Sequence, residues 1–172
     1  GSEMCIRDSN KRRQSCEAAV AAIQKKHPHV EFLRDCTTAM LEEAKADISA
    51  EDYMRAEYVI EEIQRVLDVC DALEKDDYET VGQKMYETHH GMSKLYEVSC
   101  EELDFLNDCA KEYGVTGSRV MGGGFGGCTI NLVKNELYDN FVEKTKEAFK
   151  AKFGRSPKVY DVVIGDGSRR VE

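Results

Sequence analysis

The residues that most clearly suggest a binding or catalytic role lie between 122 and 127, where five of six positions are glycine. The segment GGGFGG runs directly into CTINLV, a stretch rich in β-branched residues. Glycine reaches positive φ without strain and leaves space for a ligand or a second backbone at van der Waals distance. We therefore expect a loop built around a ligand or another loop, formed by Gly122, Gly123, Gly124, Phe125, Gly126 and Gly127.

Three familiar glycine loops do not fit this segment. Gly122, Gly124 and Gly127 match G-x-G-x-x-G, but a dinucleotide fingerprint must open a helix, whereas a strand is predicted to follow here. A phosphate-binding P-loop continues with Lys and Ser or Thr, and this chain has Cys128 and Thr129. A protein-kinase glycine loop needs H-R-D and D-F-G segments, which the sequence lacks. The purely structural alternative is a tight hairpin with a bulge, although hairpins usually need only one or two glycines.

A few other side chains have types that can bind or react. His89 shares an apolar helix face and has no Cys or carboxylate at ligand spacing, so we interpret it as a packed or interfacial histidine. Arg119 precedes the glycines, and two roles stay open for it: an ion pair with carboxylates near the loop, or contact with a phosphate. Cys128 is expected to be a small buried residue. The sequence predicts no metal site.

Composition and charge favour a folded domain and exclude several classes of function. The chain has 172 residues, 41% hydrophobic and 33% charged, which allows one self-sufficient core. A net charge of −9, with a single basic cluster at residues 11–13, argues against nucleic-acid partners. The longest apolar run, residues 18–23, is far too short to span a membrane. Seven cysteines without a C-x-x-C pair fit reduced thiols, so we expect a cytoplasmic protein.

The residues before the glycines predict a series of helices. The first nine residues, GSEMCIRDS, show no periodicity and are treated as an unstructured or artefactual start, with the domain covering residues 10–172. A helix is predicted from Asn10 to the HPH segment. Ser49 begins a second strong helix, Asp77 caps the next, and Ser99 begins another that Gly114 ends in a left-handed turn.

The last third of the chain predicts β-loop-β-α-β. VTGSRVM, residues 115–121, and CTINLV, residues 128–133, are short strands around the glycines. Asn135 caps a last helix that Gly154 closes, and KVYDVVIG, residues 158–165, is a final strand. The order of elements favours an α+β domain.

Several segments together resemble the galactokinases, members of the GHMP small-molecule kinase superfamily. GSRVMGGGFGGCTINLV is similar to the family's third motif, G-S-R-M-T-G-G-G-F-G-G-C followed by a strand. NKRRQSCEAA is similar to Y-N-x-R-R-x-x-C-E, and RAEYVIEEIQRV to R-x-x-H-V-x-x-E-x-x-R. GQKMYETHHGMSKLYEVSCEELDFL is similar to G-x-x-M-x-E-S-H-x-S-L followed by V-S-x-x-E-L-D. The resemblance covers the chain from about Asn10 to its end.

The resemblance implies a fold and an activity. The fold is a ferredoxin-like GHMP kinase C-terminal domain, with helices packed on an antiparallel sheet. The activity is phosphorylation of galactose to galactose 1-phosphate with ATP and Mg²⁺. In the family the third motif lies beside the sugar and phosphate sites, so residues 122–127 would position substrate and phosphate through backbone N–H groups. Arg12 and Arg13 would lie exposed or docked against the other half of the enzyme.

The chain also departs from the family pattern. The R-x-x-x-x-G-E-H-x-D signature, the G-x-G-L-S-S-S phosphate loop and the catalytic aspartate belong to the N-terminal half and are not found in these 172 residues. Ser9 stands where the family has a galactose-contacting tyrosine. We therefore expect a C-terminal portion without catalytic residues or tightly bound cofactors, inactive alone, meeting ATP and galactose through the other half.

Other interpretations stay open. The chain can come from a galactokinase-like regulatory protein that senses galactose and ATP, or from another GHMP sugar kinase. As a plain structural module, it would expose an apolar domain interface and self-associate.

Overall fold

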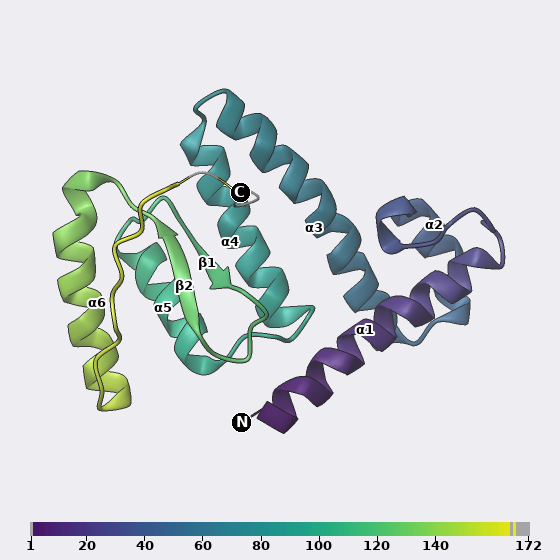
Figure 1. Cartoon of the computed structure of the whole chain (residues 1–172), viewed down its shortest axis with the longest axis horizontal. Coiled ribbons are helices and arrows are strands. Elements are labelled where there is room, and N and C mark those ends of the chain that lie inside the picture. The colour runs from purple at the N-terminus through teal and green to yellow at the C-terminus, as the bar shows by residue number, and fades with distance from the viewer. Residues whose placement is uncertain (1, 166, 168–172) are drawn as a thin grey trace, which may run out of the picture.

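The computed structural model describes residues 2–165 and residue 167. It consists mainly of helices with one small antiparallel sheet (Figure 1). In chain order the elements are α1 (Ser2–Gln24), η1 (Leu33–Asp35), α2 (Thr38–Glu43), η2 (Lys45–Asp47), α3 (Ala50–Glu74), α4 (Tyr78–Lys94), α5 (Glu101–Glu112), β1 (Gly117–Met121), β2 (Cys128–Leu132), η3 (Asn135–Leu137) and α6 (Tyr138–Phe153).

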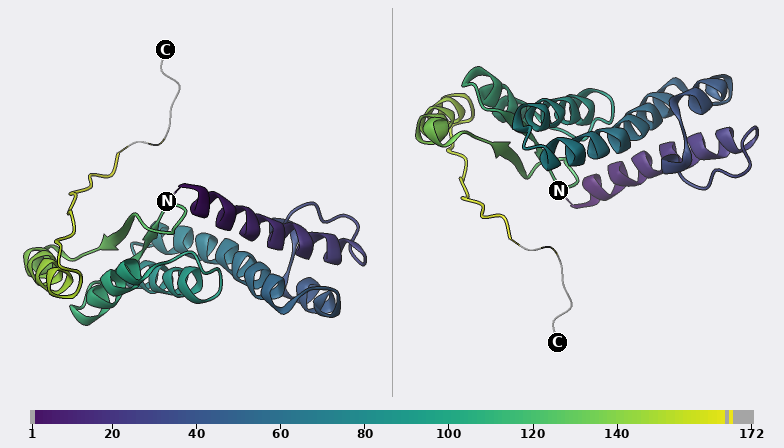
Figure 2. Two further views of the ribbon diagram at one scale, coloured as in Figure 1. Left: turned by 90° about the horizontal axis from the view of Figure 1, so that it is seen from below. Right: turned by 90° about the horizontal axis from the view of Figure 1, so that it is seen from above.

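One part of the molecule is a helical arm formed by α1, α2 and the first half of α3. The two long helices lie side by side, and α2 closes the far end of the arm (Figures 1 and 2). Apolar residues at helical spacing on α1 meet those on α3, and the loops between them fold over this seam. The resulting core contains Ala19, Ala22, Ile23, Val30, Leu33, Leu41, Ala44, Ala56 and Ile60.

The other part is a hairpin unit formed by β1, β2 and helices α4, α5 and α6. β1 pairs antiparallel with β2, with Val120 opposite Thr129 and Met121 opposite Cys128. Helix α4 packs closely on β1 because Gly82 leaves room for the backbone of Thr116: a methyl group at Gly82 would overlap the Thr116 carbonyl oxygen. Rings of Phe105, Phe149 and Phe153 join α5 to α6.

The ends of the helices test the predicted caps. Ser49 accepts a hydrogen bond from the Asp52 amide at 3.1 Å, and Asp77 accepts one from the Thr80 amide at 3.0 Å, so both predicted starts are confirmed. Gly114 is left-handed, with a φ of 74°, as predicted, and Gly154 ends the last helix as predicted, with a φ of 70°. The Ser99 cap is wrong, because α5 begins after Cys100 and the Ser99 hydroxyl donates to a side chain instead.

The cap predicted for the last helix is wrong as well. Asn135 begins a short 3-10 turn rather than capping α6, which starts after Leu137 without a side-chain cap. The chain therefore makes one tight turn between β2 and α6.

The predicted final strand at residues 158–165 is wrong. This segment carries no strand, and Figure 2 shows it leaving the helices. Its side chains are largely exposed, Val163 at 90% and Ile164 at 97%. A sequence rich in β-branched residues forms a strand only when a neighbouring strand supplies hydrogen-bond partners, and none of the described residues does so here. Instead of the ferredoxin-like arrangement expected from the resemblance, the described residues form a mostly helical fold with a two-stranded antiparallel sheet.

The bounds of the chain's first helix also differ from the prediction. Helix α1 begins at Ser2, inside the segment 1–9 that was expected to be unstructured. Extending an existing helix adds one hydrogen bond for each residue ordered, which costs far less than starting a new one. At the other end, residue 166 and residues 168–172 of the expected domain lie outside the described residues.

In the part of the chain that the structure describes, each helix is either too short or too polar to cross a lipid bilayer.

Candidate functional site

The glycine segment connects β1 to β2 at the tip of the hairpin. Four of its glycines have φ in the left-handed region, between 80° and 129°, and so does Phe125 at 58°. A side chain placed at Gly122, Gly123, Gly126 or Gly127 would meet no atom within 4 Å. The loop therefore presents an open backbone surface on the side away from its own chain.

Gly124 is the point where the loop touches the rest of the molecule. Its φ is 80°, and a side chain there would overlap the carbonyl oxygen of Val98. The next residue, Phe125, donates its backbone N–H to that same carbonyl at 2.6 Å. Both observations require glycine at this position, because any side chain would add strain and push the two backbones apart. The second loop anticipated from the sequence is therefore the turn at residues 95–98.

That turn is held by side chains from two distant helices. Arg12 of α1 donates from Nε to the Tyr96 carbonyl at 2.9 Å and from Nη2 to the Glu97 carbonyl at 2.7 Å. Arg55 of α3 donates to the Glu97 carboxylate at 2.8 Å. The Arg12 guanidinium also lies over the Phe125 ring, 5.7 Å from its centre. Arg12 is thus buried against the glycine loop, whereas Arg13 is exposed and pairs with Glu17.

Arg119 lies on β1, two residues before the strand ends. It is half-buried, and its Nη1 donates to the Val120 carbonyl at 3.0 Å. Among the described residues it has no ion pair, so carboxylates near the loop do not engage it. Burial raises the pKa of Tyr58, the charge of Glu62 adds to this, and the charges of Arg65 and Arg119 partly oppose it. Cys128 is half-buried at the other end of the loop.

His89 is packed inside the molecule, as the sequence predicted. Its side chain is 5% exposed, and its Nε2 lies 3.1 Å from Asp104 of α5. Burial lowers the pKa of His89, and the Asp104 charge opposes this only in part.

Asp104 joins three parts of the chain. Ser99 donates to it at 2.6 Å and Ser93 at 2.8 Å. Partial burial raises the pKa of Asp104, but hydrogen bonds from Ser99 and Ser93 and the nearby His89 outweigh it, so the pKa lies below the usual range. This network fastens both ends of the turn that the glycine loop touches, since Ser93 precedes the turn and Ser99 follows it.

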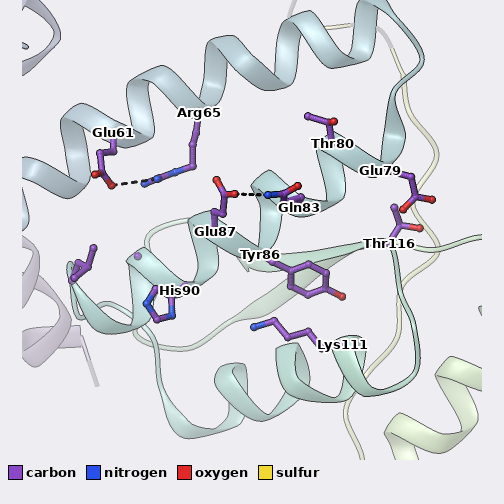
Figure 3. Close-up of a pocket in the computed structure, with 12 residues that line it drawn as sticks. Glu61, Arg65, Glu79, Thr80, Gln83, Tyr86, Glu87, His90, Lys111 and Thr116 are labelled. Atoms are coloured by element: carbon purple, nitrogen blue, oxygen red, sulfur yellow. Dashed lines mark hydrogen bonds and ion pairs between the residues drawn. The ribbon is translucent and has the colours of Figure 1, made fainter. Parts of the chain in front are cut away.

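A hollow of about 810 Å³ lies across α3, α4 and α5 (Figure 3). Its lining mixes both signs of charge and includes Arg65, Glu79, Tyr86, Glu87, His90 and Lys111. None of the glycine-loop residues lines it. Within the described residues no cluster of three metal-ligating side chains occurs either. The open backbone of residues 122–127 is therefore the stronger candidate for ligand contact.

Comparison with known proteins identifies the family. Residues 69–151 match the family GHMP kinases C terminal. A galactokinase from Clostridium beijerinckii is 41% identical over 94% of this chain and 42% of its own length. A galactokinase from Thermotoga petrophila is 35% identical over 98% of this chain and 46% of its own length. The chain thus spans a little under half the length of these relatives.

The fold agrees with these sequence matches. The crystal structure of Lactococcus lactis galactokinase complexed with galactose superposes with a TM-score of 0.80 at 24% identity, over 87% of this chain and 39% of that one. The chain carries the C-terminal fold of the GHMP kinases. Within this superfamily it belongs to the galactokinases, whose C-terminal portion it matches.

The structure brings some sequence candidates together and adds others. The glycines, Arg12 and the Tyr96 to Val98 turn converge, while Arg119 and Cys128 flank them without direct bonds to the turn. Sequence reasoning did not assign Glu97 or Arg55 a role, although both lie in segments that resemble family motifs. Their pairing across 42 positions leaves no trace in helix periodicity.

Proposed function

We propose that this chain is the C-terminal part of a galactokinase that, at full length, transfers a phosphoryl group from ATP to galactose and forms galactose 1-phosphate. The observation that carries the proposal is the glycine loop at 122–127, whose backbone is open at four glycines and which carries the family's third motif. The Lactococcus relative forms a complex with galactose, which supports the same substrate class here.

In this proposal the loop positions ligands and does no proton transfer or covalent chemistry. Its backbone N–H groups would approach the phosphate or the sugar on the open side, where no side chain stands between them. Arg119, which lacks an ion pair among the described residues, would add positive charge near the transferred group. Transfer of a phosphoryl group depends mainly on such positioning and on electrostatic stabilisation of spread negative charge.

ATP and Mg²⁺ would be held largely by the other half of the enzyme. When bound, Mg²⁺ neutralises charge on the phosphates. The open backbone of the glycine loop would contact a phosphate, whereas the described residues offer no group of three side chains that could hold the metal. We therefore propose that the isolated chain does not turn over galactose, and that the complete enzyme acts in the cytoplasm, where ATP is present and free thiols such as Cys16, Cys36 and Cys109 stay reduced.

A hybrid enzyme tests the proposal directly. Residues 10–172 would replace the matching C-terminal portion of the Clostridium beijerinckii galactokinase, and ADP release would be measured with galactose and Mg²⁺-ATP. We expect turnover in the hybrid, none in the isolated chain, and at least a tenfold lower kcat/KM in a Gly124→Val hybrid. Galactose-dependent turnover by the isolated chain would contradict its proposed inactivity, and a folded but inactive hybrid would contradict the proposed function.

We also propose that the isolated chain self-associates through its exposed apolar segment at 159–164. Sedimentation velocity over a range of concentrations tests this: a concentration-dependent increase in mass is expected, and replacing Val163 and Ile164 with Ser should abolish it. A chain that stays monomeric at all concentrations would contradict it.

A further inference from the structure

Glu97 occupies an unusual place in the turn between α4 and α5. Its φ is 54°, in the left-handed region, which is uncommon for a residue other than glycine. Its half-exposed carboxylate lies 2.8 Å from the Nη2 of Arg55 and 3.5 Å from the Nη2 of Arg12. The two arginine side chains are only 5% and 11% exposed. One carboxylate therefore serves two nearly buried guanidinium groups from different helices.

Each arginine is also fixed to its surroundings. Arg55 donates to the Ser15 hydroxyl at 3.1 Å and pairs with Glu51 one turn earlier on α3. Arg12 donates to the backbone carbonyls of Tyr96 and Glu97. Because a buried charge is costly without a partner, both helices hold the turn in one position.

The same turn continues directly into the contact with the glycine loop. The Val98 carbonyl, one residue after Glu97, accepts the Phe125 N–H at 2.6 Å, and Gly124 packs against the same carbonyl. Arg12 closes the arrangement by covering the Phe125 ring. A chain of adjacent contacts therefore runs from the arm through Glu97 to the tip of the hairpin.

We infer that Arg12, Arg55 and Glu97 are positioning residues that set where the glycine loop stands relative to α1 and α3. None of the three touches the open side of the loop, so they act on a ligand only through the loop backbone. That the network holds the loop follows from the contacts alone. That it thereby tunes phosphate or sugar binding rests on the proposed galactokinase function.

Amide hydrogen exchange of the 172-residue chain, followed by NMR, tests the positioning role. Glu97→Gln keeps the size of the side chain, but it removes the charge that holds two arginines and replaces one acceptor oxygen with an amide donor. We expect exchange of the Phe125 N–H to become at least tenfold faster, while the Leu106 N–H within α5 keeps its rate. Glu51→Gln is the matched control, because it removes the other carboxylate paired with Arg55 and leaves the turn untouched; both amides should keep their rates.

Two outcomes would overturn the inference. One is an unchanged exchange rate at Phe125 in Glu97→Gln, and the other is equal acceleration at Phe125 and Leu106, which would mean that Glu97 stabilises the whole fold rather than the loop. Arg12→Lys adds a rescue test: it keeps the charge but offers a single nitrogen in place of the guanidinium fork that serves both carbonyls, so we expect an exchange rate between those of the wild type and Arg12→Gln. A wild-type exchange rate at Phe125 in Arg12→Gln would contradict the positioning role of Arg12.

Introducing Glu97→Gln into the hybrid enzyme separates the positioning of the loop from its role in substrate binding. If Glu97 positions the loop and the loop binds substrate, the variant should raise KM for ATP or galactose. The fold increase in KM should be at least five times the fold decrease in kcat. Faster Phe125 exchange with unchanged kinetics would keep the positioning role and refute the loop's place in the proposed function. A larger fall in kcat than rise in KM, with Phe125 exchange unchanged, would refute the positioning role.

Discussion

The helical arm and the hairpin unit are stabilised in different ways. The arm is filled by aliphatic side chains such as Ile23, Val30 and Leu41, all at 0% exposure. The hairpin unit also buries polar residues within it, among them His89, Asn107 and Ser118, and brings backbones into contact at glycine. The buried polar side chains of the arm, Arg12, Ser15 and Arg55, belong to the network that reaches the turn at residues 95–98.

The difference bears on where a binding loop can be placed. A core of aliphatic side chains tolerates substitutions that keep its volume, whereas hydrogen-bonded polar groups and close backbone contacts allow one geometry. The glycine loop lies in the hairpin unit and is joined to the arm by Arg12, which covers the Phe125 ring, and by the bonds of Arg12 and Arg55 to Glu97. The position of the loop therefore depends on a few named contacts, each of which can be removed separately.

The largest effect is expected from a cavity in the arm. Leu41→Ala should lower the free energy of unfolding by about 4 kcal/mol, because it removes a fully buried side chain that closes the α2 end of the core. Urea unfolding followed by circular dichroism measures the change. Leu67→Ala is the control, since Leu67 is 55% exposed. A similar loss of unfolding free energy in both variants would show that burial of Leu41 does not stabilise the arm.

A methyl group at Gly82 should have the next largest effect. Gly82→Ala is expected to lower the free energy of unfolding by about 3 kcal/mol, because the added methyl meets the Thr116 backbone, which cannot move aside as a flexible side chain can. Gly123→Ala has open space around it and should stay within about 1 kcal/mol of the wild type. Equal unfolding free energies for the two variants would refute close backbone packing as the basis of the α4–β1 contact.

Removing the buried side-chain amide of Asn107 should lower the free energy of unfolding by about 2 kcal/mol. Its Nδ2 donates to the Ser118 carbonyl at 2.7 Å, and Asn107→Ala would leave that carbonyl without its partner in a site that is 1% exposed. Asn140→Ala on the exposed surface of α6 is the control and should change stability little. If Asn107→Ala unfolds at the same urea concentration as the control, polar contacts do not stabilise the hairpin unit.

The smallest effect is a dependence of stability on pH. Burial lowers the pKa of His89 below its value of about 6.5 in the unfolded chain, so the unfolded state binds more protons below that pH. The free energy of unfolding should therefore fall as the pH drops from 7.5 to 5.5, and the fall should be smaller in His89→Gln. Asp104, whose pKa is lowered, adds stability that is present above about pH 4 and is lost as the pH falls through its folded pKa.

Urea titrations at pH 7.5 and 5.5 measure this term. His90→Gln, at the neighbouring position on α4, should keep the full pH dependence. If the free energy of unfolding changes by the same amount between the two pH values in His89→Gln as in the wild type, groups other than His89 cause the pH dependence.

Local sequence signals predicted the elements well where the relevant bonds are local. Ser49 and Asp77 begin their helices as expected, because a cap needs only an amide three residues away. Ser99 has the same kind of spacing to Glu102, but the helix begins one residue later, after Cys100, and the Ser99 hydroxyl donates to Asp104. Residues 158–165 carry strand-forming side chains without a strand, because pairing depends on residues elsewhere.

The glycine loop and its family were readable from the sequence by itself, since five glycines in a row of six and the surrounding motif are properties of adjacent residues. The helices and the hairpin followed from periodicity and turn residues for the same reason. Only the tertiary structure decided that Gly82 serves a backbone contact and that Arg12, Arg55 and Glu97 meet. These contacts join residues up to 85 positions apart, and such distances are set by how the helices pack, which no local pattern records.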